Sequence, residues 1–197
     1  MHLASFSPFP YLNSCFLQCT RYAKIERTVI TSEIVEKTCS QVGEYSDETM
    51  AEEFERFFRQ QPAVCDFVVD LTHDSGQQIQ ELSLFLAYMV FKVVHVAGGS
   101  VALITRDALE SAYHASESWI NQMSEAEGPE LQAALAAGFN KDTEPYLLQY
   151  VISELNQPLE DGSELDDNGK GEVFFLLKTV ISSLSDKENT IGFEGFE

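Results

Sequence analysis

The chain has 197 residues, of which 44% are hydrophobic and 11% aromatic, so it can bury a normal globular core without disulfide or metal cross-links. Its 32 Asp and Glu residues face 12 Lys and Arg residues, which gives a formal net charge of −20. Because the basic residues form no cluster, binding to nucleic acid or to an anionic membrane surface is disfavoured. An acidic surface keeps a protein soluble and steers basic partners or cations towards it.

The beginning of the chain differs from the rest in charge. Residues 1–25 carry Arg21 and Lys24 but no acidic residue, and their opening is rich in Ser, Pro and aromatic residues. They lack the charged start, the continuous apolar stretch and the cleavage site of a signal peptide, so we expect a cytoplasmic protein. We interpret residues 1–11 as an irregular arm and expect a helical domain over residues 12–186.

The four cysteines all lie in the first third of the chain. Cys15 and Cys19 are one helical turn apart, and Cys39 and Cys65 follow at longer intervals. This spacing matches no familiar zinc finger, and a domain of this size needs no disulfide. We therefore expect reduced, partly buried thiols.

Helix signals follow one another along the chain. Ser46 or Thr49 can cap one helix, Pro62 ends that helix and suits the first turn of the next, and Thr105 and Thr143 can cap two later helices. No pair of β-like segments is joined by a hairpin signal. The stretches with helical spacing or punctuation are residues 31–43, 45–62, 62–72, 77–97, 105–123, 128–138, 142–158 and 168–184, with 12–27 as a further candidate.

The most apolar stretch is LSLFLAYMVFKVVHVAGG, residues 82–99. Its apolar part is shorter than the roughly 20 residues that a bilayer span requires, and Lys92 would lie inside the membrane. A helix that is apolar nearly all round is typical of a buried central position. We therefore predict an all-α, single-domain bundle of about eight helices packed round residues 77–97.

Two residues are candidate metal ligands. Asp70 and His73 stand three positions apart on one predicted helix face, as in half of a carboxylate–histidine di-metal site. Such a site requires a second copy of the pair, which the sequence lacks. The alternative is a histidine at a helix C-terminus, where the helix dipole favours its charge.

A second acidic motif resembles a calcium loop. The segment ELDDNGKGE places Glu164, Asp166 and Asn168 at the first, third and fifth loop positions, but Phe175 stands where the bidentate Glu is required. We expect a solvated acidic turn instead.

The final residues, 187–197, form an acidic tail that repeats Gly-Phe-Glu. Phe193 and Phe196 are candidate partner-binding residues, because aromatic anchors often dominate binding energy. The alternative is that Ile191, Phe193 and Phe196 pack against this protein's own core.

The charge and the lack of catalytic motifs together favour a non-catalytic acidic helical interaction protein, of the adaptor, regulator or inhibitor type. The sequence has no P-loop, G-x-G-x-x-G or G-x-S-x-G motif, so we predict no cofactor. The expected partner is a protein with a basic surface, and a homo-oligomer stays possible. Two alternatives are a metal-dependent helical enzyme that uses Asp70 and His73, and a small-molecule-binding bundle with a pocket beside Tyr88, Tyr113 and Trp119.

Overall fold

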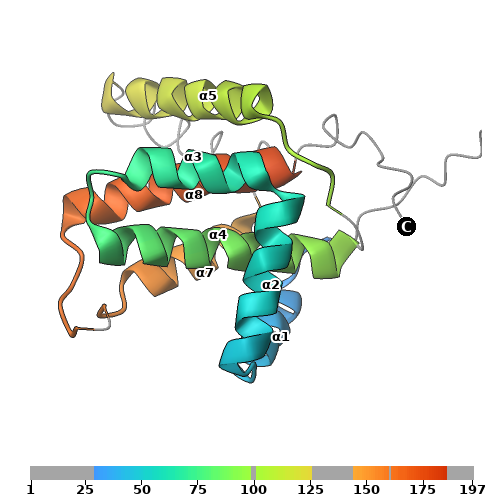
Figure 1. Cartoon of the computed structure of the whole chain (residues 1–197). Coiled ribbons are helices and arrows are strands. Elements are labelled where there is room, and N and C mark those ends of the chain that lie inside the picture. Colours follow the sequence, from blue (N-terminus) through green and yellow to red (C-terminus); the bar gives the residue numbers. More distant parts are fainter. Residues whose placement is uncertain (1–28, 99–100, 126–143, 160, 186–197) are drawn as a thin grey trace, which may run out of the picture.

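The computed structural model describes residues 29–98, 101–125, 144–159 and 161–185, and within these ranges the chain forms helices and no strand. The prediction of an all-α fold is confirmed for this part of the chain. The predicted helices over 12–27 and 128–138 lie outside the described residues. The helices (Figure 1) are α1 (Ser32–Gly43), α2 (Asp47–Gln60), α3 (Pro62–Thr72), α4 (Gln77–Gly98), α5 (Arg106–Glu125), α7 (Pro145–Leu155) and α8 (Asp167–Ser185).

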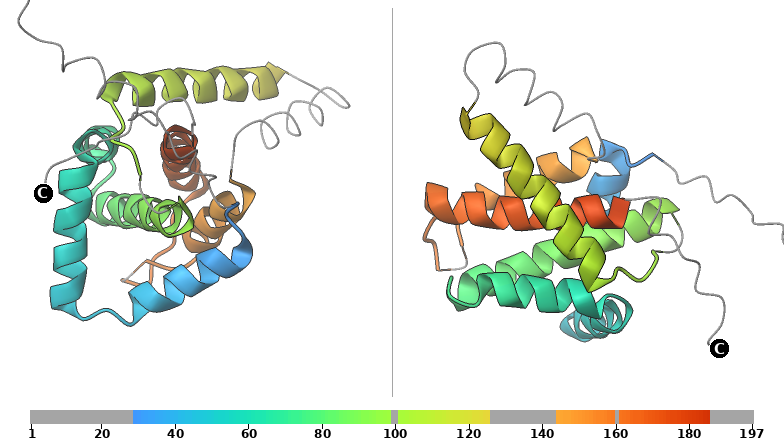
Figure 2. Two further views of the ribbon diagram at one scale, coloured as in Figure 1. Left: turned by 90° about the vertical axis from the view of Figure 1, so that its right-hand side faces the viewer. Right: turned by 90° about the horizontal axis from the view of Figure 1, so that it is seen from above.

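Helix α4 lies in the middle of the arrangement and packs most extensively against α3 and α8, with α1 as a further neighbour. Figure 2 (left) looks along α4 and shows the other helices around it. Its residues Leu86, Tyr88 and Val90 are completely buried. Among the described helices, α4 alone is long and apolar enough to cross a membrane, but 56% of its most apolar 18-residue window is buried inside this fold. Burial on several sides explains why the helix is apolar nearly all round.

Short polar side chains and prolines define several helix starts. Ser46 caps α2 and Thr105 caps α5, each by accepting a hydrogen bond from the backbone N–H three residues later. The prediction for α7 was wrong by one residue, because Glu144 and not Thr143 occupies the N-cap position. Pro145 then stands at the first helical position, where its missing N–H costs nothing and its fixed φ suits the helix.

The connection between α4 and α5 is extended, and a buried glutamine holds it in place. Gln61, at the junction of α2 and α3, is 0% exposed. Its Nε2 donates to the carbonyl of Ala102 at 2.7 Å, and its Oε1 accepts from the N–H of Ile104 at 3.0 Å. The side-chain amide therefore bonds the backbone of this segment through one donor and one acceptor, as the backbone of a neighbouring strand would. The Ile104 side chain is buried in the core.

Helix α5 covers α8 and α3 (Figure 2, right). Its Tyr113 ring packs edge-on against Phe67 of α3 and Phe175 of α8, with centroid distances of 6.1 and 4.9 Å. At the start of α5, the Arg106 guanidinium bonds the Asp70 carboxylate of α3 at 3.1 Å. These contacts join α5 to the helices beneath it.

Candidate functional site

Exposed carboxylates gather where α1 turns into α2. The loop and the first part of α2 form an acidic corner, which we define as the exposed residues Glu44, Asp47, Glu48 and Glu52. Two of these carboxylates stand in the first turn of α2, where the positive end of the helix dipole stabilises them. The arginines of α2 stand near its other end, so the corner itself presents one sign of charge.

An ion pair fixes the helix that carries the corner. The Lys92 ammonium of α4 bonds the Glu53 carboxylate of α2 at 2.5 Å, and both side chains are nearly buried, at 12% and 13% exposure. Burial alone would raise the pKa of Glu53, but the hydrogen bond and charge of Lys92 outweigh it and hold that pKa below 4.5. Lys92 also lies 5.7 Å from the centre of the Tyr45 ring. The pair is therefore an anchor for α2 and not a free reactive group.

Aromatic rings surround this ion pair. Phe54 of α2 stacks on Tyr88 of α4 at 4.8 Å, and the Tyr88 hydroxyl lies 3.5 Å from Glu53. Burial and the charge of Glu53 raise the pKa of Tyr88 well above its usual value. One turn further on, His95 stacks on Phe91, and burial together with the charges of Lys92 and Arg56 lowers its pKa. Burial and these charges favour the neutral form of His95.

The two candidate metal ligands are each engaged elsewhere. Asp70 bonds Arg106, and the His73 Nδ1 lies 2.9 Å from the carboxylate of its neighbour Asp74. His73 occupies the C-cap position of α3, as the alternative interpretation expected. Within the described ranges, no group of three or more His, Cys, Asp or Glu side chains is arranged to hold a metal ion.

The acidic turn before α8 has a local structural role. The Asp166 carboxylate accepts a hydrogen bond from the N–H of Gly169 at 2.7 Å and so caps the first turn of α8. Glu164 and Asp166 both border the cavity described next.

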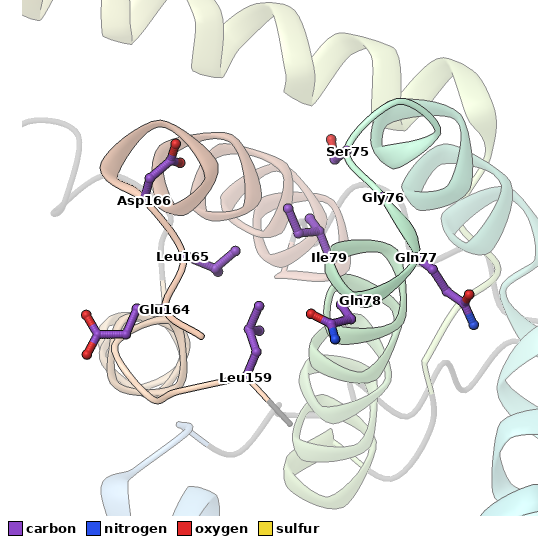
Figure 3. Close-up of a pocket in the computed structure, with 9 residues that line it drawn as sticks. All are labelled: Ser75, Gly76, Gln77, Gln78, Ile79, Leu159, Glu164, Leu165 and Asp166. Carbon is purple, nitrogen blue, oxygen red and sulfur yellow. The ribbon is translucent and has the colours of Figure 1, made fainter. Parts of the chain in front are cut away.

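A cavity of about 490 Å³ lies between the α3–α4 turn and the connection from α7 to α8. In Figure 3 the side chains of Ile79, Leu159 and Leu165 point into it, whereas those of Glu164 and Gln77 point away. The cavity is an open recess lined by both apolar and polar residues.

The aromatic residues that the sequence suggested for a pocket do not meet there. Tyr88 is completely buried between α2 and α4, whereas Tyr113 belongs to the ring cluster of α3, α5 and α8. Neither residue borders the cavity. The side chain of Trp119 lies outside the description, as do Phe193 and Phe196 of the tail.

Sequence reasoning missed two polar contacts between helices. Cys39 of α1 shares a hydrogen bond with Tyr150 of α7, and burial raises the pKa of both groups and of the neighbouring Glu154. Lys178 of α8 is only 8% exposed, with its ammonium 3.4 Å from the Ser116 hydroxyl, and burial lowers its pKa. In both cases the partners are far apart in sequence, so no local sequence pattern indicates the contact.

The thiols of the described helices are free. Cys39 is partly buried and Cys65 is buried, and burial raises the pKa of Cys65 to about 12. A thiol with so high a pKa is a poor nucleophile at neutral pH. Cys39 is partly buried, as predicted, whereas Cys65 is more deeply buried than predicted. The reduced state of the thiols stays a prediction, and Cys15 and Cys19 lie outside the described residues.

Comparison with known proteins gives no match: no family model, no curated protein and no solved structure is significantly similar to the chain.

Proposed function

We propose that the chain is a single-domain, non-catalytic helical interaction protein of the adaptor, regulator or inhibitor type, which acts in the cytoplasm. Its partner is a protein with a basic surface, and the acidic corner is the part that meets it. The observation that carries this proposal is the group of four exposed carboxylates on one helix start and its preceding loop. The net charge of −20 supports it.

The physical basis of the interaction is long-range attraction followed by docking on a firm support. Clustered charge of one sign raises the rate of encounter with an oppositely charged partner. The Glu53–Lys92 ion pair and the stacked rings of Phe54 and Tyr88 hold α2 against α4, so the corner is presented on a fixed element. Little conformational entropy is then lost when a partner binds.

The test is capture of partners from a native extract at low and high salt, with protein identification by mass spectrometry. Exposed charges are screened over about 10 Å at 0.1 M salt, so capture should fall steeply as salt is added. A triple variant with Glu44→Lys, Glu48→Lys and Glu52→Lys should lose the same partner at low salt.

The matched control places the same charge change elsewhere. Glu81, Glu117 and Glu172 are exposed acids of α4, α5 and α8, and their triple Lys variant should keep the partner. Equal loss in both variants would show that only net charge matters. Capture that resists both salt and the corner variant would contradict the proposal.

The two alternatives have less support. For a metal-dependent enzyme, Asp70 would have to leave Arg106, and no third ligand lies close in the described part of the chain. A small-molecule binder requires a cavity, and the recess beside Ile79 and Leu165 is large enough to hold a small ligand. Thermal unfolding with and without added Mg²⁺, Mn²⁺ or Zn²⁺ tests the first alternative, since a bound ion would raise the midpoint.

A further inference from the structure

One end of the helix bundle combines exposed apolar side chains with arginines. Helices α2, α4 and α8 all end there and α5 begins there, and Figure 2 (left) shows this end face-on. The surface, which we name the arginine end, consists of Arg56, Arg59, Arg106, Phe58, Val96 and Leu103.

The apolar side chains of the arginine end are exposed to solvent. Phe58, Val96 and Leu103 are 42%, 47% and 43% exposed. They belong to three different elements, so they do not form the single face of one helix. Removing them from water would be favourable for each in proportion to its area.

Contacts between side chains place these elements side by side. The Phe57 ring of α2 lies 5.2 Å from Phe91 of α4, and Phe91 stacks on His95, the residue before Val96. Phe57 also lies 6.1 Å from Phe58. Gln61, three residues after Phe58, binds the backbone on both sides of Leu103.

Arginines stand at this end, although the carboxylates that they pair with balance their charge. Arg56, Arg59 and Arg106 keep 54%, 69% and 56% of their side chains exposed, although each already contacts a carboxylate of a neighbouring turn or helix. A guanidinium has five N–H donors, so each arginine can donate hydrogen bonds to a further carboxylate. The arginine end therefore suits an acidic segment with large apolar side chains.

The chain itself contains such a segment. The tail that follows α8 reads DKENTIGFEGFE over residues 186–197, with four acids against one lysine. Helix α8 ends at Ser185 on the same end of the bundle (Figure 1). Phe193 is eight residues further on, a span of up to about 26–29 Å for extended chain.

We propose that residues 191–196 dock on the arginine end of the same chain. Phe193 and Phe196 cover Phe58 and Leu103, and Glu194 pairs with Arg59. The tether keeps the tail at a high effective concentration near this surface, so weak contacts suffice to hold it. The acidic corner stands at the opposite end of α2, so this docking is independent of the function proposed above.

The experiment is hydrogen–deuterium exchange of the full chain, read at the backbone amides of residues 190–197. A tail docked in about four-fifths of the molecules exchanges about five-fold more slowly than the same sequence as a free peptide. Phe58→Ala should return these amides to within about two-fold of the peptide rate. This variant leaves the tail sequence unchanged, so intrinsic exchange rates are the same.

Ile152→Ala is the matched control, because Ile152 of α7 is also 42% exposed and belongs to none of the elements of the arginine end. It should leave the tail protection unchanged. A charge swap gives a second measurement: Arg59→Glu and Glu194→Lys should each remove most of the protection, and the double variant should restore it.

Three results would overturn the proposal. The tail amides could exchange at the peptide rate in the unaltered chain, or Phe58→Ala could leave their protection intact. Protection that rises with protein concentration would place the tail on a second copy of the chain and not on its own.

Discussion

Gln61 gives the sharpest test of how the fold is held together. Gln61→Leu keeps a side chain of similar size but removes both hydrogen bonds to the α4–α5 connection. The Ile104 N–H is buried, and leaving it unpaired costs about 1–3 kcal/mol. The Ala102 carbonyl is partly buried and adds about 0.5–1.5 kcal/mol. We therefore expect a loss of roughly 2–4 kcal/mol in the free energy of unfolding.

The assay is urea unfolding followed by circular dichroism, with Gln60→Leu as control. Gln60 is the exposed neighbour in the last turn of α2, so its substitution should change stability by less than about 0.5 kcal/mol. Hydrogen exchange at Ile104 gives a local readout and should become faster in Gln61→Leu alone. Equal stability of the two variants, with unchanged exchange at Ile104, would refute the idea that Gln61 holds this connection.

Three further predictions concern the core, the ion pair and a helix cap. Leu86→Ala in α4 should lower the free energy of unfolding by about 2–5 kcal/mol and the exposed Leu71→Ala by far less, in the same urea assay. Because the folded pKa of Glu53 is lowered, its contribution is present above the unfolded value of 4.5 and is lost as pH falls through the folded pKa. Unfolding curves from pH 7 to pH 3 should therefore show Glu53→Gln losing less stability on acidification than the unaltered chain. Ser46→Ala removes the cap of α2 and should cost about 1 kcal/mol by thermal unfolding, which Ser46→Asp should largely preserve.

Local chemistry explains why so much of the helical layout could be read from sequence. A capping hydroxyl, as in Ser46 and Thr105, acts on an N–H three residues away, and Pro62 acts on its own backbone. Such signals need no knowledge of the rest of the fold. At α7 the proline was correctly placed in the first turn, and the N-cap position is one residue later than predicted, at Glu144.

The polar contacts that shape the candidate surfaces could not be predicted in this way. Lys92 looked only like an interruption of an apolar helix, yet it pairs with Glu53, 39 positions earlier. Asp70 was grouped with His73 because the two stand on one helix face, but the start of α5 brings Arg106 to it instead. A pattern along one helix cannot show which other helix will pack against it.

The sequence by itself determined that this protein is helical, that residues 77–97 form a buried helix, and that its charge is strongly negative. Each of these follows from composition or from spacing within one element. Only the tertiary structure decided which helices surround α4, where exposed carboxylates and arginines separate along α2, and how Gln61 holds the segment before α5. These features depend on contacts between residues distant in sequence, and such contacts are set by how all the helices share one apolar core.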